Sequence, residues 1–239
     1  MDLDFPVRIN KYLAHKGYAT RRDADTLIEK GLVLVNGVPA IIGQKVDKKD
    51  VIEVRGMEKK AFRYLLYYKP RGVITHSPAP HETDIAMELR KTYKLTGIFP
   101  VGRLDKDSEG LMILTDDGRV TDRLLNPAHE HEREYEVTVD KAVTGALIKR
   151  LAGGVTIERY RTKPAIAKRL GERRLSLTLT EGKKHQVRRM CAALGYQVTA
   201  LKRVRIGTLS LGALKPNQYK LLKGTEQKKF LSWLTLPVG

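Results

Sequence analysis

The chain has 239 residues, of which 41% are hydrophobic and 30% charged, so it is long enough to bury a core and too hydrophobic to be disordered throughout. Its one cysteine, Cys191, excludes an intramolecular disulfide and a cysteine-based zinc site. No run of about 20 apolar residues occurs, and the first residues, MDLDFPVRINKY, include no hydrophobic signal region. We therefore expect a cytoplasmic protein with no membrane-spanning helix.

The net charge is the most informative property of the composition. Lysine and arginine number 45 against 27 aspartate and glutamate residues, which gives +18 at pH 7. Such an excess predicts a polyanionic partner, because each neutralised phosphate releases condensed counterions. A generally basic surface or an anionic membrane is the alternative, but no basic amphipathic helix with an aromatic face is present. We expect a nucleic acid.

Residues 8–54 are predicted to form a small structural unit of their own. The segment RINKYLAHKG has apolar residues at helical spacing and ends in a glycine, and a second helix is predicted to begin after Thr20, with a capping acid three residues later. Asn36 and Gly37 lie between two apolar runs and predict a hairpin, because both positions of that turn need a positive φ. With a third strand at 51–54, the sequence predicts two helices packed on a small sheet.

A linker is predicted at residues 57–62, where periodicity is lost and charge increases. Residues 1–56 have a net charge of only +2, but the two predicted helices contain a group of basic residues that can form one positive face. We expect RNA-binding contacts from Arg8, Lys11, Arg21 and Arg22.

From residue 63 the chain mixes strands and helices without regular alternation, which favours an α+β fold. Strands are predicted within 63–70, 97–104, 111–115, 135–139, 175–180 and 198–206, and helices near 83–94, 119–125, 144–151, 184–194 and 225–235. The six strands and their helices are expected to form one separate domain over residues 63–239.

The segment GRLDKDSEGLMILTDDG, residues 102–118, has the densest set of polar residues between apolar runs. Three interpretations are open. It resembles a calcium loop, although strands rather than helices are predicted on both sides. In the second interpretation, Arg103 and Asp105 form a simple ion pair at a turn. In the third, Asp105 is a catalytic carboxylate that basic neighbours keep ionised as a nucleophile.

Two further segments contain candidate site residues. The strand at 131–140 alternates and places Tyr135 either in the core or at the mouth of a site. In EGKKHQVRRMCAALGY, residues 181–196, a basic turn leads into a helix whose buried stripe includes Cys191, so we expect that thiol to pack rather than react. No Walker loop, Rossmann fingerprint, HExxH or GxSxG motif occurs, so nothing supports nucleotide hydrolysis, dinucleotide redox or serine-hydrolase chemistry.

Taken together, these motifs resemble a known family. RINKYLAHKGYATRRDADTLIEKGLVLVNG is similar to an S4-type RNA-binding domain, and KPRG, GRLDKDSEGL, EYEV and HQVRRM occur in the order found in bacterial ribosomal RNA pseudouridine synthases of the RsuA/RluB/RluE/RluF type. The spacing around GRLDKDSEGL is most similar to the RluF-like large-subunit branch. The resemblance implies an S4 domain followed by a catalytic domain with a mixed, mostly antiparallel sheet.

The resemblance also implies site residues. Asp105 corresponds to the aspartate that attacks the target uridine, at C6 or at C1′; Arg103 to the arginine that holds the gap left by the flipped base. Tyr135 corresponds to the tyrosine that stacks on the base and deprotonates C5, and Arg188 to the arginine that pairs with the aspartate. From the same motifs we expect RNA contacts by Lys69, His185, Gln186 and Arg189.

The chemistry implied is isomerisation of uridine to pseudouridine, which exchanges an N1–C1′ bond for a C5–C1′ bond and needs neither cofactor nor metal. The target base must be flipped out of its stem to reach Asp105. We expect ribosomal RNA of the large subunit as substrate, with small-subunit or transfer RNA as alternatives, and a monomeric enzyme. A non-catalytic S4-domain protein of ribosome assembly is the alternative function, and it leaves the order of the catalytic motifs unexplained.

Overall fold

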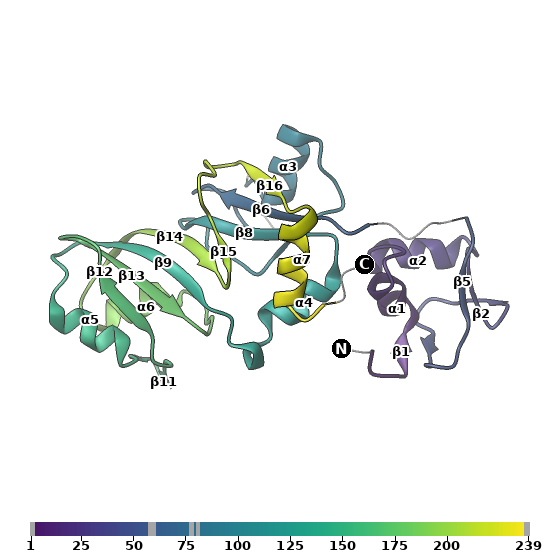
Figure 1. The fold of residues 1–239 in the computed structure, drawn as a ribbon, viewed down its shortest axis with the longest axis horizontal. Coiled ribbons are helices and arrows are strands. Elements are labelled where there is room, and N and C mark those ends of the chain that lie inside the picture. Colours follow the sequence, from purple (N-terminus) through teal and green to yellow (C-terminus); the bar gives the residue numbers. More distant parts are fainter. Residues whose placement is uncertain (1–2, 57–60, 77–78, 80–81, 237–239) are drawn as a thin grey trace.

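The structure, a computed structural model, describes residues 3–56, 61–76, 79 and 82–236. A small N-terminal part and a larger part follow one another along the chain (Figure 1). Each has sheets of its own and hydrophobic clusters of its own. Helices α1 (Ile9–His15) and α4 (Gly118–Leu125) connect the two parts by direct contact. Residues 57–60 of the predicted linker lie outside the described residues.

The small part confirms the predicted pair of helices on a small sheet. Thr20 caps α2 (Arg21–Glu29) by accepting the backbone N–H of Asp23 at 3.2 Å, while its hydroxyl donates to the Asp23 carboxylate at 2.8 Å. Asn36 and Gly37 have φ values of 53° and 80°, as the predicted hairpin turn requires. The strands are β2 (Val33–Val35), β3 (Val38–Pro39) and β5 (Ile52–Val54) in one sheet, and β1 (Val7–Arg8) with β4 (Lys45–Val46) in another.

Nine strands form the sheet of the larger part in the order β12-β13-β9-β14-β8-β6-β16, with β15 beside β14 and β7 beside β8. Among the described strands, only β14 and β8 pair in parallel, so the sheet is mixed and mostly antiparallel as predicted. The strands are β6 (Tyr64–Lys69), β7 (Phe99–Val101), β8 (Glu109–Thr115), β9 (Arg133–Val139), β12 (Ile166–Arg169), β13 (Arg174–Leu179), β14 (Val198–Ile206), β15 (Leu209–Ser210) and β16 (Tyr219–Leu221).

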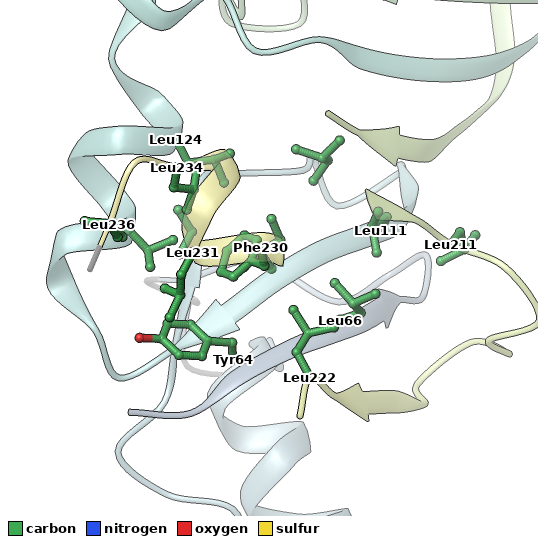
Figure 2. Close-up of a cluster of buried hydrophobic side chains, with 14 of the residues drawn as sticks. Tyr64, Leu66, Leu111, Leu124, Leu211, Leu222, Phe230, Leu231, Leu234 and Leu236 are labelled. Carbon is green, nitrogen blue, oxygen red and sulfur yellow. The ribbon is translucent and has the colours of Figure 1, made fainter. Parts of the chain in front are cut away.

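Helices cover the sheet and create three core clusters in the larger part. Helices α5 (Gly145–Ala152) and α6 (Gln186–Ala193) pack on the half formed by β9, β13 and β14, and α3 (Ile85–Tyr93) packs on β6 and β8. Helix α7 (Gly224–Trp233) closes the third cluster together with α4 (Figure 2). Two short elements complete the fold, a 3₁₀ turn at Pro127–His129 and a hairpin of β10 (Thr156–Ile157) and β11 (Tyr160–Arg161).

The six strands and five helices predicted for the larger part are all present, and the α+β fold is confirmed. The buried stripe of α6 is also confirmed, with Met190 and Cys191 fully buried. Strands β12 and β16 were not predicted, because short edge strands with exposed basic residues such as Lys168 lack the apolar alternation that marks a strand. In the described part of the chain, none of the helices has the length and apolar character needed to cross a bilayer.

Candidate active site

A cleft of about 650 Å³ opens on the larger part, at the place where several distant segments meet. Its walls come from the loop between β7 and β8, the end of α4, the first residues of β9, the turn between β13 and α6, and the middle of β14. Five of the predicted site residues line it, namely Arg103, Asp105, Tyr135, His185 and Gln186. These residues lie up to 83 positions apart in the sequence, so only the fold brings them together.

Asp105 is held in place by the anchoring of its neighbours. Leu104 is buried in the α3 cluster, and its backbone N–H and C=O both bond to the hydroxyl of Thr75, at 3.1 and 2.7 Å. On the other side, the backbone N–H of the fully buried Ser108 donates to the carbonyl of Asp105 at 3.0 Å. The Asp105 side chain, 36% exposed, therefore projects from a fixed turn into the cleft.

The side chain of His185 contacts the Asp105 carboxylate. Its Nε2 lies 3.2 Å from Oδ1 of Asp105, and the residue occupies the left-handed region with φ 53° as the N-cap of α6. Among the described residues, no ion pair joins Arg103 to Asp105, which removes the interpretation of these two residues as a simple pair at a turn. Arg103 is exposed at the cleft instead.

The expected pair of Arg188 with Asp105 is not formed, and this expectation is corrected. The guanidinium of Arg188 donates to the carbonyl of Val198 at 3.0 Å, to the carbonyl of Asp107 at 3.2 Å and to Oγ of Ser108 at 3.4 Å. It is directed by α6 toward the turn after Asp105 rather than toward its carboxylate. In this structure Arg188 supports the turn that positions the carboxylate.

Tyr135 satisfies both interpretations that the sequence allowed. Its ring packs against two core clusters, that of β9, β13 and β14 and that of β6, β8 and α3, and it also lines the cleft. In the sheet it lies opposite Leu177 on β13 and Arg203 on β14. The ring is therefore fixed by packing while one side remains open to the cleft, which suits a residue that stacks on an inserted base.

Two residues expected to contact RNA are buried. For Lys69, which does not line the cleft, burial corrects the expectation, whereas Gln186 lines the cleft and its contact with RNA stays a prediction. Lys69 is fully buried, and its Nζ donates to the carbonyls of Pro70 at 2.9 Å and Ser108 at 2.7 Å. Burial lowers the pKa of this amine to about 8. Gln186 is 4% exposed and its amide orders the turn before α6, donating to Glu181 at 2.6 Å and accepting from the backbone N–H of Lys183 at 2.8 Å.

Glu181 was not predicted as a site residue, although it lies in a motif that the sequence singled out. The residue is 9% exposed, and its carboxylate accepts hydrogen bonds from the hydroxyl of Tyr160, the backbone N–H of Lys163 and the amide of Gln186. It therefore ties the β10–β11 hairpin to the turn that contains His185. No pattern in the sequence distinguished this buried carboxylate from a surface acid.

Two arginines in the cleft wall were also missed, Arg133 and Arg203. Arg133 is half-buried and donates to the carbonyls of His131 at 3.3 Å and Leu124 at 3.0 Å, and burial lowers its pKa. The alternation of side chains between the two faces of β9 could have indicated Arg133 as a cleft residue. It lies two residues before Tyr135 and therefore on the same face.

The remaining predicted residues lie outside the cleft. Arg189 forms an ion pair with Glu158 at the tip of the β10–β11 hairpin. Arg8, Lys11 and Arg21 are exposed on the small part, and Arg22 lies in α2. Within the described residues, no group of three His, Cys, Asp or Glu side chains is arranged to hold a metal ion.

Known protein families match both parts of the chain. The model of the RNA pseudouridylate synthase family matches residues 63–193, and that of the S4 domain matches residues 7–52. The chain is 36% identical to the dual-specificity RNA pseudouridine synthase RluF of Escherichia coli K12 over 93% of this chain and 78% of that protein. It is 37% identical to ribosomal large subunit pseudouridine synthase B of Bacillus subtilis, over 93% of this chain and 94% of that protein.

A solved pseudouridylate synthase structure shares the fold with a TM-score of 0.69 and 29% identity, covering 95% of this chain and 99% of its own. The S4 and synthase domains indicate RNA binding, and the matched synthase region includes Asp105, Tyr135 and the turn before α6. The chain belongs to the RNA pseudouridylate synthase family.

Proposed function

We propose that this synthase acts on a uridine of large-subunit ribosomal RNA and that Asp105 is its nucleophile. The observation that supports the proposal most directly is the meeting of Asp105, Tyr135 and Arg103 in one cleft. The name of the Bacillus subtilis relative supports a ribosomal substrate. A ribosomal substrate also implies a cytoplasmic enzyme.

In the proposed reaction, a carboxylate oxygen of Asp105 attacks the flipped uridine at C1′ or at C6. The N1–C1′ bond breaks, the uracil rotates and a C5–C1′ bond forms. The bond from Asp105 to C1′ or C6 then breaks and frees the carboxylate, and the proton lost from C5 is balanced by a proton gained at N1. Tyr135 stacks on the uracil and its hydroxyl serves as the base for the C5 proton. Because the product is an isomer of the substrate, no oxidant, reductant or water is consumed.

The basic residues at the cleft supply the energy for base flipping. Unstacking a nucleotide costs a few kcal/mol, and phosphate contacts offset that cost. Lys183, Lys184 and His185 are exposed in the turn at the cleft wall, with Arg103 on the opposite loop. We assign the backbone contacts to these lysines and the filling of the vacated stack to Arg103.

We further propose a division of labour between domains, with RNA binding in residues 1–56, a linker at 57–62 and chemistry in residues 63–239. Arg8, Lys11, Arg21 and Arg22 would then bind RNA beside the target stem. A monomer would be sufficient, since one chain supplies both the binding domain and the cleft. Arg189 would contact RNA only after release from Glu158.

The alternative, a non-catalytic S4-domain protein of ribosome assembly, is disfavoured by the family match and by the meeting of the motif residues in one cleft. Transfer RNA remains a second substrate class to be tested beside ribosomal RNA. Both questions are addressed by the same assay.

The test is release of tritium from RNA labelled at uridine C5, with separate large-subunit, small-subunit and transfer RNA transcripts. Wild-type protein should release label from the large-subunit transcript in the greatest amount. Asp105→Asn should release none while its RNA affinity stays within about twofold, because the amide has the same shape but is a poor nucleophile. Turnover by Asp105→Asn within about tenfold of wild type would overturn the nucleophile assignment, and release only from transfer RNA would overturn the substrate.

A further inference from the structure

The last residues of the polar segment at 102–118, TDDG, lie outside the cleft and take no part in the proposed reaction. They hold the first residues that follow the predicted linker. The hydroxyl of Thr115 donates to the carbonyl of Arg63 at 2.6 Å. The carboxylate of Asp116 accepts the backbone N–H of Arg63 at 2.7 Å and its Nε at 2.8 Å. The direction in which the chain enters the larger domain is therefore fixed at Arg63.

Asp117 connects the same segment to α4. Its side chain is fully buried, and its oxygens accept hydrogen bonds from the hydroxyl of Tyr64 at 2.8 Å and from Nε and Nη2 of Arg119, each at 2.8 Å. The carboxylate also caps α4 by accepting the backbone N–H of Arg119 at 3.0 Å. The guanidinium of Arg119 lies 4.7 Å from the ring centre of Phe62, the last residue of the predicted linker. A buried carboxylate with two bonds to one guanidinium thus fixes Arg119 beside the linker.

The small domain meets the larger domain at this place, where α1 contacts α4 (Figure 1). His15 is the last residue of α1, and its ring is half-buried. Its Nδ1 is buried and has no hydrogen-bond partner in the described part of the chain. Burial lowers the pKa of His15, and the charge of Arg119 is the next largest cause of that lowering. Lys16 lowers the pKa further, whereas Asp117 raises it. The end of α1 therefore lies in a surrounding that is positive on balance.

We infer that this junction, in which Asp117 orients Arg119 at the end of α1, sets the orientation of the small domain and thereby the RNAs that the enzyme prefers. The inference rests on the proposed function, in which the small domain binds RNA beside the target stem. Two RNA-binding sites held at a fixed span act at a high effective concentration when one RNA presents both elements at that span. An RNA with another span gains nothing from the second site.

The junction should affect RNA binding and leave the chemical step unchanged. His15, Asp117 and Arg119 do not line the cleft, and they make none of the contacts that hold the turn of Asp105. Release of the small domain should therefore raise the KM for an RNA that engages both sites. The kcat should stay at the wild-type value.

His15 permits a test in which charge and docking predict opposite results. His15→Lys and His15→Arg place a second cation near Arg119, so repulsion should release the small domain. Each also adds a positive charge, which by itself would strengthen RNA binding. His15→Glu offers a carboxylate to Arg119 and should keep the domain docked, although the added negative charge would by itself weaken RNA binding.

The kinetic measurement is tritium release by the full chain from two RNAs. One is the large-subunit transcript, and the other is the shortest stem–loop cut from it that is still a substrate. His15→Lys and His15→Arg should raise the KM for the transcript by about tenfold, with the kcat and both constants for the stem–loop unchanged. His15→Glu should stay within about twofold of wild type on both RNAs.

Docking itself is measured by pulsed electron spin resonance between two nitroxide labels. They are attached after the substitutions Lys48→Cys in the small domain and Lys149→Cys on α5, both at exposed positions. Cys191 is fully buried, so the reagent reaches only the two introduced thiols. The distribution of distances should be narrow in the wild-type background and in His15→Glu, and broad in His15→Lys and His15→Arg.

A cationic variant that folds and has a KM for the transcript at or below that of wild type would overturn the inference. An equal rise of KM on both RNAs, or a narrow distance distribution in both cationic variants, would do the same. Folding is checked by circular dichroism and thermal unfolding, and the second cationic side chain covers the failure of one.

Replacement of Arg8, Lys11 and Arg21 by alanine in the full chain separates this inference from the proposed function. An unchanged KM for the transcript in that triple variant would refute RNA binding by the small domain, and with it the proposed division of labour. A raised KM in the triple variant, together with a wild-type KM in the cationic His15 variants, would refute the inference alone.

Discussion

The hydroxyl of Thr75 bonds to both backbone polar groups of Leu104, accepting its N–H at 3.1 Å and donating to its C=O at 2.7 Å. Thr75 is 3% exposed and lies in the loop after β6, 29 positions from Leu104 in the sequence. This double contact fixes the residue immediately before Asp105. The position of the proposed nucleophile therefore depends on a residue that belongs to none of the motifs that indicated the family.

Replacement of Thr75 by valine should impair both stability and turnover. Valine has nearly the same shape but leaves two buried backbone groups of Leu104 without a partner, which costs about 1–3 kcal/mol of unfolding free energy. The freed turn should also displace Asp105 and lower the single-turnover rate by about tenfold or more, since small misplacements are costly in catalysis. Thr75→Ser keeps the hydroxyl and should retain most of the activity. Equal rates in Thr75→Val and wild type would show that Leu104 is positioned by its packing alone.

Tyr135→Phe should separate stacking from proton transfer. The ring and its packing remain, so RNA affinity should change by less than about twofold, while loss of the hydroxyl should lower turnover by about a hundredfold or more if it is the base. Tyr196 provides a matched control, because its hydroxyl contacts the carbonyl of Ala142 and it does not line the cleft. Tyr196→Phe should be as active as wild type. Normal turnover of Tyr135→Phe would leave Tyr135 with stacking only.

Lys69 should make stability depend on pH in the alkaline range. Its pKa is lowered by burial to about 8 in the folded protein, against about 10.4 in the unfolded chain. Between these values the unfolded state binds more protons, so the unfolding free energy should rise with pH, by about 2 kcal/mol from pH 7 to 9.5. Well below pH 8 the contribution should be constant, because the amine is protonated in both states.

The measurement is urea unfolding of wild type and Lys69→Met at several pH values. Methionine fills the space without a titrating group, so the difference in unfolding free energy between the two proteins should move in favour of wild type as the pH rises above 8. Ionisation of other groups affects both proteins and cancels in the difference. Parallel pH curves for the two proteins would mean that Lys69 keeps its ordinary pKa in the fold.

Exposed basic residues of the small domain should contribute to the salt dependence of RNA binding. Arg8, Lys11 and Arg21 are exposed, and the slope of log affinity against log salt falls by about 0.7–0.9 for each phosphate that the protein no longer neutralises. Replacing all three by alanine should therefore reduce the slope by about two to three, with the tritium-release rate at saturating enzyme unchanged.

The matched control for this triple variant replaces Lys215, Lys228 and Lys229 by alanine. One of these lysines precedes β16 and the other two lie in α7, all in the larger domain and outside the cleft. The control removes the same number of charges, so its salt slope should stay near that of wild type. An equal reduction of the slope in both variants would indicate a general effect of charge rather than a binding face.

Local sequence determined the elements and the class of reaction. The cap of α2 at Thr20, the turn at Asn36 and Gly37 and the buried stripe that includes Cys191 were all predicted and confirmed, because each depends on residues within one or two turns of the chain. The order of the motifs was likewise sufficient for the family, since it requires only the sequence.

Tertiary structure alone decided what the site residues touch. Arg188 bonds to Ser108, 80 positions away, rather than to Asp105, and Lys69 is buried against a carbonyl 39 positions away rather than exposed to RNA. Arg203 lies in the cleft wall and bonds to the carbonyl of Leu111, 92 positions earlier. Burial of a charged side chain is set by packing between distant segments, so no local pattern of residues reveals it.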